Sequence, residues 1–71
     1  MYLIECLNNE RIKECTKIVN TRNCYTLEFS TPLEDVAMIQ IPDDNIVELS
    51  NQKETYAVPY FDSLADDWTI E

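Results

Sequence analysis

The chain contains no glycine in its 71 residues. Glycine enters the left-handed backbone region without steric cost, so tight turns in this chain must be made by other residues. Asn and Asp tolerate that region best after glycine, and proline interrupts helices and strands. These residue types gather at Asn8-Asn9, at residues 20–23, at residues 42–45, at Asn51 and at prolines 32 and 59. The chain is therefore divided into short segments of secondary structure.

Four of these segments have the pattern of β-strands. In residues 24–29, Tyr25, Leu27 and Phe29 alternate with more polar residues, which is the period of two expected of a half-buried strand. The segment 36–41 is more continuously apolar, which predicts a more central strand. Two further short strands are expected at 46–49 and 55–58, and residues 42–45 predict a hairpin connection between two apolar runs.

The first third of the chain fits more than one structure. Leu3, Ile4 and Leu7 would share one face of a helix, yet residues 1–7 would also make a strand. Residues 11–19 favour a strand over a helix because several of their side chains are β-branched. We expect a short helix or strand at the N-terminus, followed by an antiparallel sheet.

One helical turn is expected near the C-terminus, at residues 63–67, with Asp62 or Ser63 as its cap. Taken together, the segments predict a single domain, residues 1–71, of the mainly β or α+β class. The expected architecture is a small antiparallel sheet of about four to five short strands, with at most one or two short helices.

The charge of the chain is strongly negative and unevenly distributed. Fourteen acidic residues stand against five basic ones, for a formal net charge of −9, and residues 23–71 contain Lys53 as their only base. Such a charge repels nucleic acids and anionic membranes, and it favours a partner with a basic surface. We therefore expect no direct nucleic-acid binding and no membrane association. Solubility alone is the simpler explanation of the acids.

Cysteine usage indicates a reducing compartment. Three cysteines are an odd number, which argues against a closed disulfide framework. No stretch resembles a signal peptide, and none approaches the ~20 apolar residues that span a bilayer. We expect a cytoplasmic protein with reduced thiols. A domain of this size often gains stability from a partner subunit, so a homo-oligomer is a further expectation.

Chemistry that depends on histidine or glycine is excluded, because the chain has neither. Ser-His and Cys-His nucleophiles and glycine-rich phosphate loops cannot form. Neighbouring acids such as Glu34 and Asp35 are candidates for an acid-base pair, but adjacent acids on a loop are usually a solvated face. No CxxC pair anchors a zinc site, and no segment matches a calcium loop. We expect no catalytic residue, no metal site and no cofactor.

The segment 56–71 is the most distinctive. It holds three other aromatic residues and the only Trp of the chain among four acids. One interpretation is structural: Leu64, Trp68 and Ile70 close the core of a small sheet. The other is an aromatic platform beside acids, which stacks on a nucleobase or binds a cationic side chain. Both interpretations hold if Trp68 buries one face of its indole ring and exposes the other to a ligand.

The motif VPY at residues 58–60, followed by LADDWTI at residues 64–70, resembles the C-terminal signature of the phage Thoeris anti-defence sponges. In that family a Val-Pro-Trp strand end precedes a Leu-Ala-Asp/Glu-Asp-Trp turn and a closing strand. The resemblance implies a small α+β oligomer that sequesters cyclic ADP-ribose-type nucleotide signals of bacterial immunity without hydrolysing them. The residues assigned on this basis to a ligand pocket are Tyr60, Asp67 and Trp68. The basic cluster of the first third adds Arg11 and Lys13, which would have to converge on a phosphate-bearing ligand.

The charge supports an alternative, an acidic mimic of nucleic acid. Carboxylates on one face would stand in for phosphates and occupy the basic cleft of a nucleic-acid-binding host or defence protein. The predicted contact residues are Glu34, Asp35, Asp43, Asp44, Glu48, Asp62, Asp66 and Asp67. A third hypothesis is a structural subunit without a ligand. The sequence as a whole favours a non-enzymatic, phage-encoded counter-defence inhibitor in the host cytoplasm, whose target is a nucleotide immune signal or a defence protein.

Overall fold

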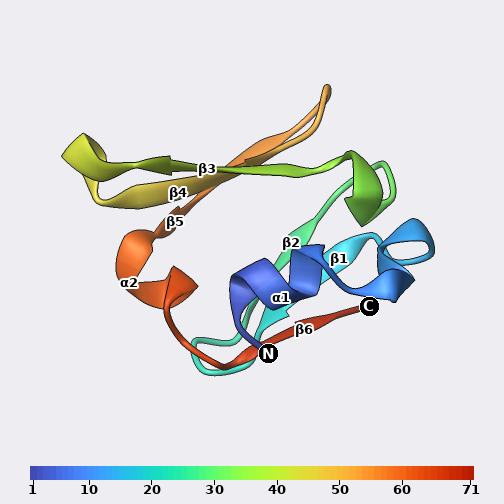
Figure 1. Ribbon diagram of the computed structural model, residues 1–71, viewed down its shortest axis with the longest axis horizontal. Coiled ribbons are helices and arrows are strands. Elements are labelled where there is room, and N and C mark those ends of the chain that lie inside the picture. The colour runs from blue at the N-terminus through green and yellow to red at the C-terminus, as the bar shows by residue number, and fades with distance from the viewer.

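The polypeptide forms six strands, two short α-helices and three 3-10 turns. The computed structural model describes all of residues 1–71. In chain order the elements are α1 (Leu3–Leu7), η1 (Glu10–Lys13), β1 (Lys17–Asn20), β2 (Tyr25–Glu28), η2 (Leu33–Asp35), β3 (Ala37–Ile41), η3 (Pro42–Asp44), β4 (Ile46–Ser50), β5 (Thr55–Pro59), α2 (Tyr60–Ser63) and β6 (Trp68–Ile70) (Figure 1). All strand pairs are antiparallel, and the class predicted from the sequence is confirmed.

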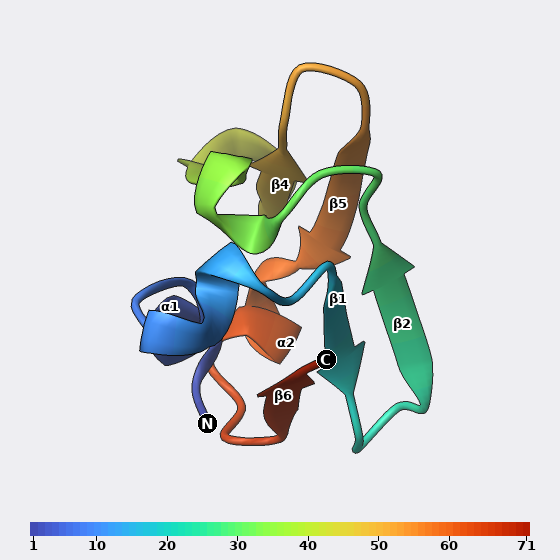
Figure 2. The same ribbon diagram turned by 90° about the vertical axis from the view of Figure 1, so that its right-hand side faces the viewer.

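The strands belong to two sheets. Sheet A has the order β2-β1-β6, and sheet B has the order β3-β4-β5. Figure 2 shows β4 and β5 of sheet B above the three strands of sheet A. Sheet B is a meander of consecutive strands, whereas sheet A includes β6 from the C-terminus. Local sequence patterns do not show this division, because they do not say which strands pair.

The turns show how the chain manages without glycine. Asn45 has φ 53° and ends the predicted hairpin connection at residues 42–45, as expected of Asn. Cys24, which has φ 59°, provides the second left-handed residue, immediately before β2. The β1–β2 turn is also supported by Asn20, whose Oδ1 accepts a 2.9 Å hydrogen bond from the backbone N–H of Asn23.

The N-terminal segment is helical, which settles one of the two alternatives. The buried side chains of α1 are Leu3 and Cys6, three positions apart on one face. Ile4 is half exposed, so the predicted face of Leu3, Ile4 and Leu7 is wrong in that residue. The helix contacts β6 and covers one side of sheet A.

Two predicted segments lie elsewhere. The strand expected over residues 11–19 is confined to β1, because Asn9 Oδ1 accepts a 2.9 Å hydrogen bond from the Arg11 N–H and caps η1. The helical turn expected at residues 63–67 lies three residues earlier, in α2. Pro59 ends β5, since proline cannot continue a ladder of N–H donors, and α2 begins at the next residue.

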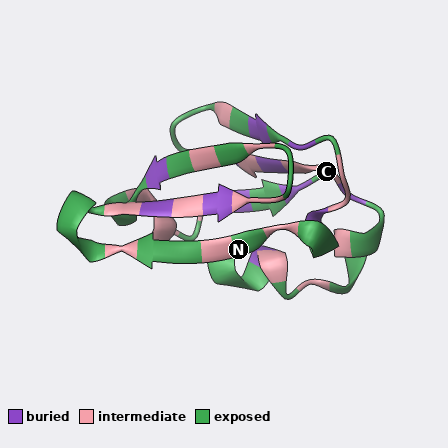
Figure 3. Ribbon diagram, turned by 90° about the horizontal axis from the view of Figure 1, so that it is seen from above, coloured by how far each residue is buried: buried purple, intermediate pink, exposed green.

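β3 is an edge strand, although its apolar sequence predicted a more central one. It pairs with β4 alone, and Ala37, Ile39 and Gln40 are exposed. Figure 3 shows sheet B from above, with β3 along its free side. This strand therefore leaves apolar side chains and backbone polar groups in solvent.

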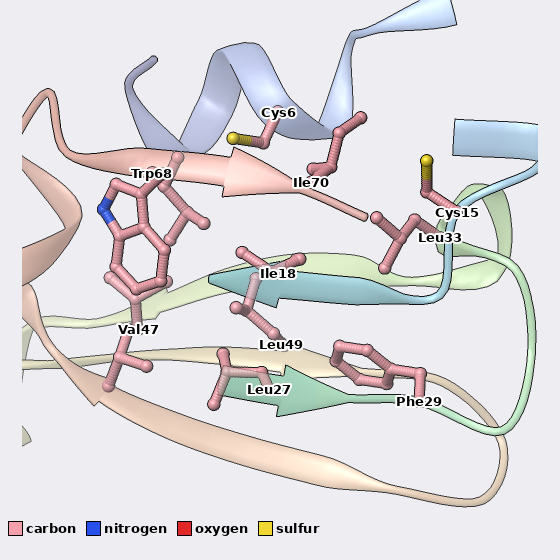
Figure 4. Close-up of a cluster of buried hydrophobic side chains, with 12 residues drawn as sticks. Cys6, Cys15, Ile18, Leu27, Phe29, Leu33, Val47, Leu49, Trp68 and Ile70 are labelled. Atoms are coloured by element: carbon pink, nitrogen blue, oxygen red, sulfur yellow. The ribbon is translucent and has the colours of Figure 1, made fainter. Parts of the chain in front are cut away.

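The core lies between the two sheets and α1. Twelve hydrophobic side chains are buried there, of which Trp68 is the largest. Figure 4 shows Trp68 of sheet A above Val47 of sheet B. Phe29 and Tyr56 form an edge-to-face pair with ring centroids 5.1 Å apart, which also joins the sheets. No helix has the length and apolar character needed to cross a membrane.

Candidate protein-binding surface

The short helix α2 is held against sheet A by one acidic residue. Asp62 Oδ2 accepts a 2.9 Å hydrogen bond from the Tyr25 hydroxyl, and Oδ1 accepts one of 3.3 Å from Asn23 Nδ2. Its backbone carbonyl accepts a third, of 3.0 Å, from the indole N–H of Trp68. Burial and the bond to Asp62 raise the pKa of Tyr25 well above its usual range. Asp62 is thus engaged in the fold, which corrects its assignment to a free acidic face.

Around α2, three apolar side chains remain in solvent. Phe61 is 78% exposed, Leu64 is 57% exposed and Tyr60 is 40% exposed. These three residues are the α2 patch. Burying a side chain such as Phe stabilises by about 1.5–3 kcal/mol, so exposed aromatics on a fixed helix favour contact with a partner. Leu64 was expected in the core, and it lies outside because the helical turn begins at Tyr60 and not at Ser63.

A shallow pocket of about 220 Å³ adjoins the α2 patch and is lined by Gln40, Pro42, Asn45, Ile46 and Tyr60. The Tyr60 N–H donates a 2.8 Å hydrogen bond to the Asn45 carbonyl, which attaches α2 to the β3–β4 hairpin. Small-molecule sites usually measure about 300–1,000 Å³, and no basic side chain lines this pocket. It therefore suits a single side chain of a protein partner better than a nucleotide.

Five of the eight predicted acidic contact residues lie along sheet B. Glu34 and Asp35 belong to η2, before β3, and Asp43 and Asp44 belong to η3, after it. Glu48 lies on β4 and is half-buried, while the other four are exposed. Figure 1 shows η3 at the same end of the molecule as α2. Asp43 and Asp44 therefore stand near the α2 patch, and Glu34 and Asp35 stand at the far end of β3.

Of the other three acids of that set, Asp62 lies in α2, and Asp66 and Asp67 lie in the connection between α2 and β6. Asp66 Oδ1 is 3.4 Å from the N-terminal ammonium of Met1. The Asp67 carbonyl accepts hydrogen bonds from the Thr21 N–H at 2.8 Å and from Thr21 Oγ1 at 3.1 Å. The predicted acids are thus divided between sheet B, α2 and this connection, and do not form one continuous face.

Trp68 belongs to the core and not to a binding site. Its side chain is fully buried, and Tyr25 packs against it edge-to-face with ring centroids 5.8 Å apart. The register explains this position: Trp68 pairs with buried Asn20 in the ladder between β1 and β6, so its side chain is on the inner face of sheet A. The ring has no free face that could stack on a nucleobase, so the platform interpretation is wrong for Trp68.

Arg11 and Lys13 are exposed on η1, which packs beside η2. Tyr60 lies on α2, at the other end of the molecule (Figure 1). The structure thus does not bring the bases together with Tyr60, Asp67 and Trp68 in one pocket. The reason is that η1 follows α1 along one side of sheet A, while Tyr60 follows β5 of sheet B.

The remaining reactive groups form no further site. Cys6 and Cys15 are buried and Cys24 is exposed, and all three are unpaired. Burial raises the pKa of the Cys6 thiol, which keeps it protonated and unreactive. No three Cys, Asp or Glu side chains are grouped so that they could hold a metal ion.

Phe61 was not among the residues singled out from the sequence. The signal was present, because Phe61 follows Pro59 and Tyr60 at a point where the alternating pattern of β5 has ended. An aromatic residue in such a turn cannot rely on a sheet face to bury it.

Comparison of the chain with protein-family models, curated proteins and solved structures gives no match. The α2 patch, the pocket beside it and the acids of sheet B are therefore the basis of the functional proposal.

Proposed function

We propose that the chain is a non-enzymatic binding protein that occupies a basic surface of another protein. The observation that supports this most directly is the α2 patch, where Phe61 is held in solvent at the same end of the molecule as Asp43 and Asp44. No base lies on α2 or on the strands of sheet B, and Lys53 is in the β4–β5 turn. An apolar anchor with an acidic surround is complementary to a basic protein surface.

The two kinds of side chain have different roles in this proposal. Phe61 and Leu64 leave water on binding and supply most of the affinity. Tyr60, at the pocket, offers a ring to an arginine of the partner, an arrangement favoured by cation–π attraction. The acids steer the encounter with a positively charged partner and raise the association rate, so binding weakens as salt rises.

The resemblance to the Thoeris sponges suggests the setting. We propose a phage-encoded counter-defence inhibitor that blocks a defence protein in the host cytoplasm. Acids along sheet B would stand in for the phosphates of a nucleic acid in the basic cleft of that protein. The sponge function, sequestration of a cyclic nucleotide, has less support because Trp68 is covered and no base faces the pocket.

The test is calorimetric titration of the chain against purified host and defence proteins that have basic clefts, and against cyclic nucleotides. With a protein that binds, Phe61→Ala should weaken binding at least about tenfold, which is about 1.4 kcal/mol. Ile4→Ala is the matched control, because Ile4 is 50% exposed on α1, and it should leave affinity unchanged.

Equal affinity of Phe61→Ala and the unmodified chain would contradict the proposed anchor. Saturable binding of a cyclic nucleotide, with no binding to any basic protein, would replace the proposal with the sponge function.

A further inference from the structure

β3 presents a row of backbone groups that no other segment of the chain pairs. Every second residue of an edge strand points its N–H and C=O away from the sheet. β3 pairs only with β4, and none of the backbone hydrogen bonds outside the ladders involves residues 37–41. No further strand lies beside this side of sheet B in Figure 3.

The edge also lacks the features that normally prevent pairing with another chain. Natural edge strands are usually blunted by a charged residue, a proline or a bulge. β3 has the sequence AMIQI, without a charge or a proline, and its register with β4 is continuous from Ala37 to Ile41. Ile39, at its centre, is 51% exposed. A straight, uncharged edge of this kind is a template for an added strand.

The charges beside the strand indicate what kind of strand fits. Glu34 and Asp35 precede β3, and Asp43 and Asp44 follow it, so an uncharged strand has an acid pair at each end. Five residues span about 16 Å at about 3.3 Å per residue. A complementary segment therefore has an uncharged centre of about five residues and a base just beyond each end.

The two ends of β3 differ in their net negative charge. Lys53 and Asp35 line a common pocket near the β4–β5 turn, so the base partly offsets the acids at the η2 end. No base is present at the η3 end, beside Asp43 and Asp44. The η3 end should thus be the stronger contact for a base.

A second copy of the chain is a poorer occupant. Antiparallel pairing of two β3 strands about Ile39 would bring the η2 acids of one copy toward the η3 acids of the other. Each copy also has a net charge of −9, so like charges would oppose the pairing.

We propose that β3 is a docking edge that accepts an extended segment of the partner protein as a fourth strand of sheet B. The segment has alternating apolar residues in its centre and Lys or Arg beyond both ends. Its apolar side chains would lie beside Ile39 and Ile41, which share the outer face of sheet B with Ile46. The basic character of the partner rests on the proposed function, whereas the open edge does not depend on it.

The test uses synthetic peptides with five alternating Val and Thr residues between paired arginines, titrated into isotope-labelled chain and followed by NMR. Shift changes and slower amide exchange should centre on residues 37–41. Two further peptides carry N-methyl groups on alternate amides. The first is methylated at the odd-numbered residues, and the second at the even-numbered residues. Only one set can face β3, so one peptide should bind at least about tenfold more weakly while the other retains affinity.

Charge reversal separates the edge from general electrostatics. D43K/D44K should weaken the arginine-flanked peptide at least about tenfold at low salt. E10K/E14K changes the net charge equally, on η1 and beside it, and should weaken binding less than about twofold. Equal losses in the two variants would overturn the proposal, as would equal binding of both N-methylated peptides.

Three other outcomes are decisive. Shift changes confined to the α2 patch would reject the edge as the site. Protection of the amides of residues 37–41 in the free chain, together with sedimentation as a dimer, would show that a second copy occupies it. Failure of all peptides, with Phe61-dependent binding of a basic protein intact, would reject the docking edge and leave the proposed function standing.

Discussion

Sheet A and sheet B have the same number of strands but different outer faces. On sheet A, alternation and register place mainly polar residues outward: Lys17, Val19, Thr26, Glu28 and Thr69. Lys17 and Glu28 form a cross-strand ion pair at 3.8 Å. On sheet B, the outward positions are Ala37, Ile39, Ile41, Ile46, Glu48, Ser50, Thr55, Ala57 and Pro59. The first is an ordinary solvated face, and the second is mainly apolar.

The two sheets also differ in how the chain closes them. Both termini are attached to sheet A, because Trp68 N–H donates to the Met1 carbonyl at 3.0 Å and Lys17 N–H donates to the Glu71 carbonyl at 2.9 Å. Neither terminus is attached to sheet B, whose edge strand β3 pairs with β4 alone. Sheet A is thus the sheet that holds the two chain ends, whereas sheet B, with α2 beside it, is the sheet to which we assign the proposed binding surface.

The largest expected effect separates a core aromatic residue from an exposed one. Trp68→Ala should destabilise the chain by about 3–5 kcal/mol, because it removes a fully buried ring and leaves a cavity. Phe61→Ala should change the free energy of unfolding by less than about 0.5 kcal/mol. Urea denaturation followed by circular dichroism measures both, and similar losses in the two variants would contradict the division between core and binding surface.

The link between sheet A and α2 should show the next largest effect. Asp62→Ala removes the acceptor of the Tyr25 hydroxyl and should cost about 1–3 kcal/mol. Tyr25→Phe tests the same bond from the other side, and a double-mutant cycle should give a coupling energy of about 1 kcal/mol. Additive losses would mean that the bond does not hold α2 in place. A coupled pair also predicts weaker partner binding in Asp62→Ala, since the α2 patch would lose its attachment.

A smaller effect concerns the connection between the sheets at the β4–β5 turn. Glu54 Oε1 accepts a 2.7 Å hydrogen bond from the Ser30 N–H, and hydrogen bonding from Ser30 lowers the pKa of Glu54. A lowered pKa in the folded state contributes stability above the unfolded value, here 4.5, and that stability is lost as pH falls. Melting temperatures from pH 7 to pH 3 should therefore fall less steeply in Glu54→Gln than in the unmodified chain. Identical slopes would contradict this.

The smallest effect compares the outer faces directly. Glu28→Gln breaks an exposed ion pair on sheet A and should cost less than about 1 kcal/mol, with the loss disappearing at high salt. Glu48→Gln, on the outer face of sheet B, removes an acid whose ladder neighbours are Ile39 and Ala57, and should be neutral or slightly stabilising. Thermal melts at low and high salt measure both, and a clear loss in Glu48→Gln would contradict the contrast.

Local pattern was sufficient for a large part of the fold. The alternation around Leu27 predicted β2, and the turn residues on either side predicted β4 and β5. Asn45 was expected to close the hairpin and does so with a left-handed backbone. These features depend on residues within a few positions of each other, where backbone sterics and the period of side chains act directly.

The candidate site was less accessible to such reasoning. The sequence motif predicts a binding role for Tyr60 and for Trp68. Tyr60 is 40% exposed, whereas Trp68 is fully buried, which excludes that role, and the motif does not single out Phe61, which is 78% exposed. Composition does not distinguish these three aromatics. What distinguishes them is whether a second element covers them. Trp68, for example, packs edge-to-face against Tyr25, which lies far along the chain in β2.

The sequence by itself determined the segment boundaries made by Asn, Asp and Pro, the antiparallel β class, the negative charge and the exclusion of chemistry that needs histidine or glycine. Only the tertiary structure decided that the strands form two sheets, that β3 is an edge and that Asp43 and Asp44 lie at the same end of sheet B as α2. The physical reason is that alternation gives a strand two faces without saying which face is covered. Coverage depends on contacts between distant residues, such as Asn20 with Trp68, which only the folded chain brings together.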